Sequence, residues 1–319
     1  MTEPEKSRIR RSTAAGQDSA IVANSHRRKK KRSKRHKKQE PAGPRLFSDF
    51  GKFANDLLTK GYCRDQSLSI STHSCTGVIV TSRAVRHGRR STANIGARYK
   101  HKNFDIQINF DTKSSISTTL TFGAEFLPST NINASLRFPK YNLSSINLNF
   151  HRSFRNAALS MSVGLNHSPV LTLSTTVGTS SLAIGMESMY ATASRSFMRF
   201  NAGLSVTSQS HDASITLAEK GDLLRLAYVR HFGGRRKVSA VAEVTRGLSN
   251  NKNSLAVGVS CIVDKLTTAK ATLNNRGMLQ ALLIHRIEPN SSLKMSGEFD
   301  MKALDKIPRI GLALALILR

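Results

Sequence analysis

Basic side chains recur at alternate positions in this 319-residue chain. In segments such as 93–100 and 104–111, apolar and polar residues alternate, and successive side chains of a strand point to opposite faces. Side chains of one charge that line a shared aqueous space attract counter-ions, so the pattern predicts an anion-attracting surface. A solvated charge on a rim or loop is the alternative for each single residue. The candidates on the polar face are Arg98, Lys100, Arg225, Lys270 and Lys294.

Residue patterns typical of enzymes are missing from the sequence. Its ten histidines include no HExxH pair, and it has no GxSxG elbow and no GxxxxGK[ST] loop. Acidic residues such as Glu187 and Glu243 are single rather than paired, so acid/base catalysis has no visible partner. The three cysteines form no CxxC motif. The sequence therefore predicts neither an enzyme nor a catalytic, cofactor or metal site.

Positive charge is strongest at the N-terminus but is not confined to it. The chain has a formal net charge of +29, of which residues 1–43 carry +10 and the remainder +19. Residues 1–43 lack periodicity, which predicts a disordered basic tail. Such a tail suits a flexible extension, a contact with polyanions or lipid surfaces, or a nuclear-targeting address. Its polybasic run comprises Arg27, Arg28, Lys29, Lys30, Lys31, Arg32, Lys34, Arg35, Lys37 and Lys38.

One amphipathic helix is predicted over residues 44–60. Pro44 suits its first turn and Gly61 its end. One face of this helix needs an apolar wall and the other needs water. The apolar stripe consists of Leu46, Phe50, Phe53 or Ala54, and Leu57. The charged residues off the stripe are Asp49, Lys52, Asp56 and Lys60.

Alternation from Ser67 onward predicts about 19 strands, each of a length that crosses a bilayer. The longest apolar run, Ile310–Leu318, is too short for a membrane-spanning helix. A soluble β-sandwich also alternates, but this chain has no Trp and scarcely any long loops. A meander in lipid must close, because open edges leave backbone groups unpaired. The predicted fold is an all-β transmembrane barrel over 67–319, an antiparallel meander closed by its first and last strands. It is too wide for side chains to fill, and the helix is predicted inside its lumen.

Five motifs of the chain are specific enough to compare with known families. They are GPRLFSDFGKFANDLL (43–58), KGD (220–222), AEVT (242–245), DKLTTAKATLNN (264–275) and SGEFDMKALDK (296–306). These motifs resemble those of the eukaryotic mitochondrial porins, or voltage-dependent anion channels, and most closely the plant members, and the resemblance covers residues 43–319. The ending RIGLALALIL is similar to the sorting signal of mitochondrial outer-membrane barrels. The residues that carry this similarity are Arg309, Gly311, Leu314 and Leu316.

The resemblance implies a voltage-gated, weakly anion-selective diffusion channel for small metabolites and ions, with the helix taking part in gating. It implies the mitochondrial outer membrane, with the plastid outer membrane less favoured. The resemblance implies membrane lipid, ATP/ADP and inorganic anions as partners. Further copies of the chain in a homo-oligomer are a candidate partner, and the charge of the tail, which lies outside the resemblance, predicts nonspecific polyanion contact.

The chain also departs from the plant pattern at several positions. Arg45 stands where plant members usually have Gly, and Phe53, Asn55 and Thr272 replace basic residues. Two alternative functions remain open from the sequence. One is an RNA- or DNA-binding protein anchored by the barrel, and the other is a protein-import-type barrel.

Overall fold

The computed structural model describes residues 43–101, 104–112, 114–122, 130–138, 145–165, 168–234, 237–287, 290–303, 305 and 307–318. The polybasic run of the tail lies outside these ranges. No helix in the described ranges is both long enough and apolar enough to cross a bilayer.

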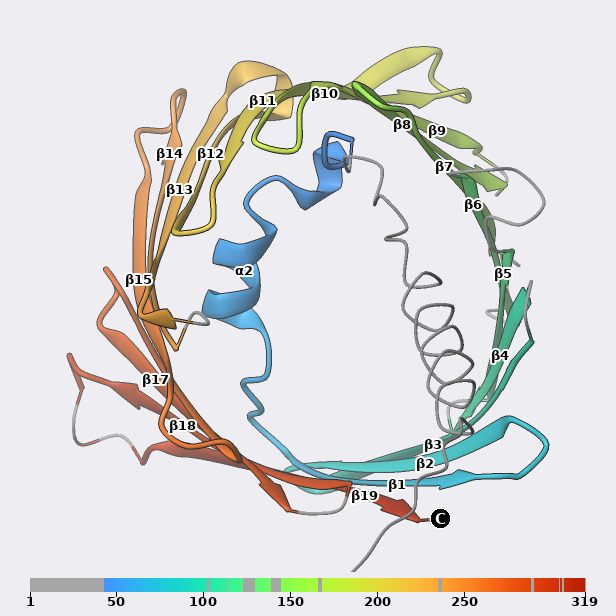
Figure 1. The fold of residues 1–319 in the computed structure, drawn as a ribbon, viewed down its shortest axis with the longest axis vertical. Helices are drawn as coiled ribbons and strands as arrows, with labels where there is room; N and C mark the ends of the chain where they lie inside the picture. The colour runs from blue at the N-terminus through green and yellow to red at the C-terminus, as the bar shows by residue number, and fades with distance from the viewer. Residues whose placement is uncertain are drawn as a thin grey trace, which may run out of the picture. The chain divides into compact units, whose positions relative to one another are not determined.

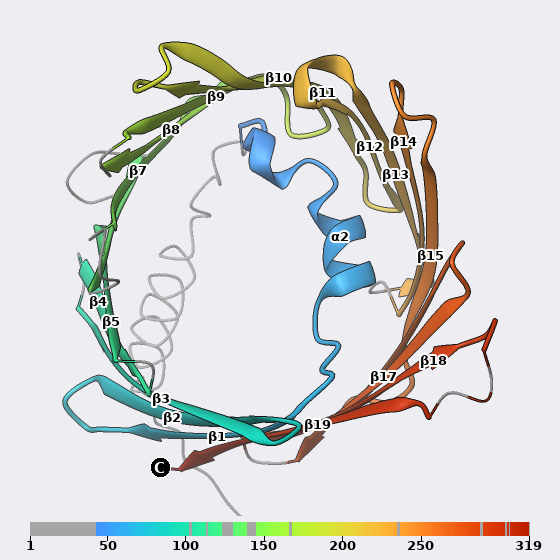
Figure 2. The same cartoon turned by 180° about the vertical axis from the view of Figure 1, so that it is seen from behind.

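Nineteen strands form one closed sheet around a wide interior, as predicted (Figures 1 and 2). The strands are β1 (Gln66–His73), β2 (Val78–His87), β3 (Arg90–Lys100), β4 (Phe104–Asp111), β5 (Ser115–Phe122), β6 (Thr130–Phe138), β7 (Ser145–Ser153), β8 (Ala157–Leu165), β9 (Val170–Gly178), β10 (Leu182–Ala191), β11 (Ser196–Thr207), β12 (His211–Ala218), β13 (Leu223–Phe232), β14 (Val238–Gly247), β15 (Asn253–Ile262), β16 (Thr267–Asn274), β17 (Met278–Ile287), β18 (Ser291–Asp300) and β19 (Arg309–Leu318). A short 3-10 helix, η2 (Glu219–Gly221), precedes β13.

The first and last strands close the barrel, and they run parallel to each other. Every other neighbouring pair is antiparallel and consecutive in the chain. In the closing pair, Leu68 lies opposite Leu314 and Ile70 opposite Leu316. An odd number of strands that alternate in direction leaves the first and last pointing the same way. A parallel closure is therefore the only one available to this strand count.

The two faces of the sheet follow the alternation in the sequence. Large apolar side chains such as Ile95 and Phe110 are about half exposed on the outer face, where they lie opposite each other on β3 and β4. Their neighbours Asn94 and Asn109 point to the interior. The outer face of the barrel is thus the apolar one, as a bilayer requires.

The predicted helix is interrupted, which corrects the expectation of one continuous helix over 44–60. A 3-10 turn, η1 (Phe47–Asp49), is followed by a bend, and the α-helix α2 covers Lys52–Thr59. Gly51 at the bend has a φ of 66°, in the left-handed region that favours glycine. Gly61, just beyond the helix end, has a φ of 99° and leads the chain away toward β1.

The bend also changes which residues are buried. Phe47, Ala54, Leu57 and Leu58 are buried, whereas Phe53 is 40% exposed. The apolar stripe predicted for residues 44–60 assumes one helical period throughout. It does not describe which residues are buried, because the bend turns the two pieces in different directions along the wall. η1 contacts β9 and β10, and α2 contacts β13, β14 and β15 (Figure 1).

Candidate functional site

The α2 helix rests on an apolar patch of the inner wall, which we call the seat: Ala227 and Val229 of β13 and Val241 of β14. Val229 is 2% exposed and Ala54 of the helix is 1% exposed. Leu57 and Leu58 complete the contact. Together, the buried apolar residues of the seat and of α2 form one cluster. The helix therefore excludes water from this part of the inner wall.

η1 docks where the wall offers space for an aromatic ring. The Phe47 ring lies so close to Gly185 of β10 and Gly203 of β11 that a Cβ on either glycine would come within 2.9 Å and 3.3 Å of it. These two glycines pair with each other across the strands. Side chains at these positions would displace the ring, so the absence of a Cβ is what admits Phe47.

The beginning of the N-terminal segment, residues 44–65, is tied to the wall by a charged contact. Arg45 Nη1 lies 3.3 Å from Asp212 Oδ1 of β12, whose side chain is only 10% exposed. The same guanidinium lies 4.8 Å above the centre of the Phe53 ring. Asp212 Oδ2 lies 3.2 Å from His231 Nε2 of β13, and His231 Nδ1 lies 2.8 Å from Ser239 Oγ.

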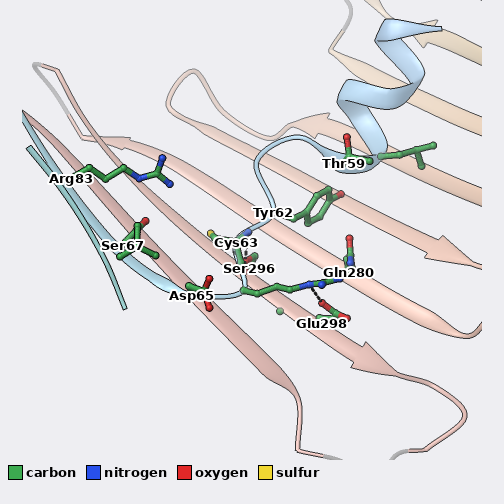
Figure 3. A pocket seen from close by; sticks show the side chains of 13 residues that line it. Thr59, Tyr62, Cys63, Asp65, Ser67, Arg83, Gln280, Ser296 and Glu298 are labelled. Atoms are coloured by element: carbon green, nitrogen blue, oxygen red, sulfur yellow. Dashed lines mark hydrogen bonds and ion pairs between the residues drawn. The ribbon is translucent and has the colours of Figure 1, made fainter. Parts of the chain in front are cut away.

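The end of the segment has a second tie, which we call the rear anchor: Cys63, Arg64, Ser296 and Glu298 (Figure 3). The Cys63 backbone N–H donates to Ser296 Oγ at 3.0 Å, and the Ser296 hydroxyl donates to the Cys63 carbonyl. Arg64 Nε lies 2.7 Å from Glu298 Oε2, and the Glu298 side chain is 9% exposed. Two buried carboxylates of the wall therefore hold the two ends of the segment.

A hollow of about 480 Å³ lies between the linker after α2 and the wall of β1, β2, β17 and β18 (Figure 3). Tyr62, Arg83 and Gln280 are among its lining residues. Burial raises the pKa of the Tyr62 hydroxyl, an effect that the nearby Thr272 hydroxyl partly offsets. Among the described residues, no group of three or more acidic, His or Cys side chains is arranged to hold a metal ion.

The four charged residues proposed for gating pair with each other along the segment. Lys52 Nζ lies 2.8 Å from Asp49 Oδ1, and Lys60 Nζ lies 3.4 Å from Asp56 Oδ2. The hydrogen bond from Asp49 raises the pKa of Lys52. All four groups are at least 30% exposed on the side away from the seat. Their charges cancel in pairs, so Arg45 carries the excess positive charge of residues 44–60.

The five basic residues predicted on the inner face differ in their surroundings. Lys270 Nζ donates to the Lys60 carbonyl at 3.4 Å, directly under the helix end. Arg225 Nε lies 3.7 Å from Glu243 Oε1 on the next strand. Arg98 Nε donates to both carboxylate oxygens of Asp105 at 2.9 Å. Lys294 shares its strand face with Ser296 and Glu298, and Lys100 shares its face with Arg98. Carboxylates on neighbouring strands thus offset two of the five charges.

The four residues of the predicted sorting signal all lie in β19. Leu314 and Leu316 pair with β1 in the closing seam. A Cβ on Gly311 would collide with the Cys63 carbonyl, so this glycine admits the linker of the rear anchor. Arg309 lies opposite Glu298 in the register of β18 and β19.

The sequence reasoning missed Asp212, His231, Ser296 and Glu298, which hold the segment. Each is one polar residue among many on an inward face, so its spacing gives no signal. The seat left a partial signal: Ala227 and Val229 follow each other on the inner face of β13, between Arg225 and His231. Two consecutive apolar residues on an otherwise polar face of a strand indicate a place where something packs.

A closed transmembrane-type β-barrel, with a wide interior and an inward-docked N-terminal segment, defines the class of barrel channels. Sequence comparison narrows this class. The profile of the eukaryotic porin family matches residues 43–311, and the chain belongs to that family.

Several plant proteins are similar to the chain over 274 residues, which cover 86% of it and 98% of each relative. Mitochondrial outer membrane protein porin 5 of Oryza sativa is 46% identical to it. Mitochondrial outer membrane protein porin 2 of Arabidopsis thaliana is 42% identical. The outer plastidial membrane protein porin of Pisum sativum is 33% identical.

Proposed function

We propose that the protein is a voltage-gated, weakly anion-selective diffusion channel for small metabolites and ions in the mitochondrial outer membrane. The observation that carries this proposal is the closed ring of strands with the N-terminal segment docked inside it. The relatives from Oryza sativa and Arabidopsis thaliana, at 46% and 42% identity, are named as mitochondrial outer membrane porins, and the plastidial porin of Pisum sativum is 33% identical. Channel activity follows from the family, and no catalytic role is proposed.

Anion selectivity is proposed to arise from an excess of basic over acidic residues. Residues 44–319 have a net charge of +19. Arg98 and Arg225 are partly neutralised by carboxylates, so Lys100, Lys270 and Lys294 are proposed to contribute most. ATP/ADP and inorganic anions are the proposed permeants. Self-association of the barrel and polyanion contact by the tail are further parts of the proposal. No feature of the described residues, and none of the three relatives named above, favours the RNA- or DNA-binding or protein-import alternatives.

The N-terminal segment is proposed to be the gate, and Arg309, Gly311, Leu314 and Leu316 are proposed to serve as the sorting signal. Asp49, Lys52, Asp56 and Lys60 are the proposed gating residues of the segment. Because their charges cancel in pairs, we expect these four residues to adjust the position of the segment more than to sense voltage.

Planar-bilayer recordings of the refolded chain test this function. In a salt gradient, we expect a reversal potential of the anion-selective sign. The double variant Lys270→Glu/Lys294→Glu should move that potential toward the cation-selective side, because it reverses two charges of the inner face. A variant lacking residues 44–60 should still conduct, with weaker voltage-dependent closure. Cation selectivity in the unaltered chain would refute the lumen assignment, and unchanged closure in the deletion would refute the gate.

A further inference from the structure

Arg45 is the residue through which the wall holds the start of the N-terminal segment. It carries the excess charge of residues 44–60, and its partner Asp212 is nine-tenths buried on β12. The two residues are 167 positions apart, so the contact exists only in the closed barrel. A buried carboxylate needs a positive or hydrogen-bonding partner, which makes this contact specific.

Asp212 has a second partner from the wall itself. Its Oδ2 atom lies 3.2 Å from His231 Nε2, whereas its Oδ1 atom faces Arg45. The His231 side chain is 8% exposed, and its Nδ1 atom lies 2.8 Å from Ser239 Oγ. A ring that donates from Nε2 to Asp212 and accepts at Nδ1 from Ser239 satisfies all three groups. If Arg45 leaves, Asp212 therefore keeps a hydrogen-bonded partner.

Phe53 joins this charged contact to the α2 helix. Its ring lies 4.8 Å beneath the Arg45 guanidinium and edge-on to the His231 ring, with the two ring centres 6.4 Å apart. Arg45 precedes the bend at Gly51, and Phe53 follows it. The contact therefore connects both pieces of the segment to β12 and β13, and cation–π attraction adds to the ion pair.

We propose that Arg45, Phe53, Asp212 and His231 form a latch that positions the N-terminal segment, and that release of this latch sets the voltage at which the channel closes. The inference rests on the proposed role of the segment as the gate. The latch is suited to release, because Asp212 stays paired with His231 when Arg45 departs. The rear anchor holds the linker by two kinds of contact, the hydrogen bonds between Cys63 and Ser296 and the ion pair between Arg64 and Glu298. The latch end therefore detaches first, and the rear anchor, with its additional hydrogen bonds, remains as the pivot.

The first test compares two variants that change the charge of the pore in opposite directions. Arg45→Gln removes a positive charge and Asp212→Asn removes a negative one, but both break the latch. Because the latch holds the segment in its docked, open position, both lower the half-closing voltage in planar bilayers. The double variant should resemble either single variant, because the two changes remove the same contact. Arg45→Lys keeps the ion pair and should move the voltage less than Arg45→Gln.

Arg276→Gln is the matched control, since it removes one exposed positive charge from the turn between β16 and β17. It should leave the half-closing voltage unchanged. Shifts of opposite sign in Arg45→Gln and Asp212→Asn would mean that pore charge, not a latch, sets the voltage. Additive shifts in the double variant, or no shift in either single variant, would also overturn the proposal.

A second measurement does not depend on conductance. A spin label on the exposed residue 48 (Ser48→Cys), in a chain whose native cysteines are replaced by alanine, reports the mobility of the segment in liposomes. Both Arg45→Gln and Asp212→Asn should increase the mobile fraction severalfold, and Arg276→Gln should not. If the protein does not close with voltage, the proposed function fails while this test of the latch still stands. Equal mobility in all variants would refute the latch.

Discussion

The inner wall of the barrel has two regions of different character. Under α2, the seat on β13 and β14 is apolar, and Val229 and Val241 are almost fully buried. On β7, the inward positions are Asn147, Asn149 and His151, which are polar. Both regions belong to strands of similar length that pair antiparallel with their neighbours, so the difference lies in the side chains. An interior that must stay wet is polar by default, and an apolar interruption marks a docking place.

The two regions of the inner wall also have different roles. The polar wall needs only to leave room for solutes, whereas the seat must hold a short helix that is not stable by itself. An eight-residue helix is marginal in water, so α2 depends on packing against the wall. Changes in the seat should therefore have larger effects than equivalent changes on the polar wall.

The largest effect is expected from Val229→Asp. A carboxylate at this buried position would lie among Leu57 and Ala54 and opposite the carboxylate of Asp212, and it should destabilise the docked segment by several kcal/mol. The measurement is the mobility of a spin label on the segment, with thermal unfolding of the barrel recorded in parallel. Asn147→Asp introduces the same group on the polar wall and should change neither. Equal effects of the two substitutions would mean that the seat is no more important for docking the segment than the polar wall on β7.

A smaller effect is expected at the bend. Gly51→Ala places a Cβ in a left-handed conformation and within 2.9 Å of Ser214 Oγ, so it should cost about 1–2 kcal/mol of docking. Gly88→Ala is the matched control, because Gly88 also has a positive φ but open space around it. It should show the backbone cost without mobilising the segment. If Gly88→Ala increases the mobility of the segment as much as Gly51→Ala does, the effect at Gly51 does not come from the contact between the bend and the wall.

The smallest effect is expected on the solvent side of the segment. Lys52→Gln removes an exposed pair with Asp49 and should cost about 0.2–0.5 kcal/mol. Because Asp49 raises the pKa of Lys52 above its ordinary value of 10.5, the pair stabilises fully below that pH and is lost as the pH rises through the raised pKa. Unfolding in denaturant at about pH 8 and about pH 11.5 should show the variant and the unaltered chain converging at the higher pH. If the difference in unfolding free energy between the two chains is the same at both pH values, the Lys52–Asp49 pair is not the source of that difference.

Part of this site could be predicted, because a local pattern carries it. Alternation in segments such as 93–100 predicts strands and their two faces, since each side chain's direction depends only on its neighbours. The positive φ at Gly51 has no such local signature, and an apolar stripe through residues 44–60 predicts a continuous helix instead. The partners Arg45 and Asp212 could not be matched from spacing, because closure of the barrel brings them together.

The sequence by itself determined the class of fold, the near count of strands, the basic balance of the pore domain and the presence of an amphipathic segment before the first strand. All of these follow from periodicity and composition, which are local or summed properties. The tertiary structure decided where the segment bends, that β13 and β14 carry it, and which charges face a carboxylate. The bend, the seat and the charge pairs depend on which strands lie next to each other and in which register. Hydrogen bonding around the closed ring fixes that register for strands that are far apart in the chain.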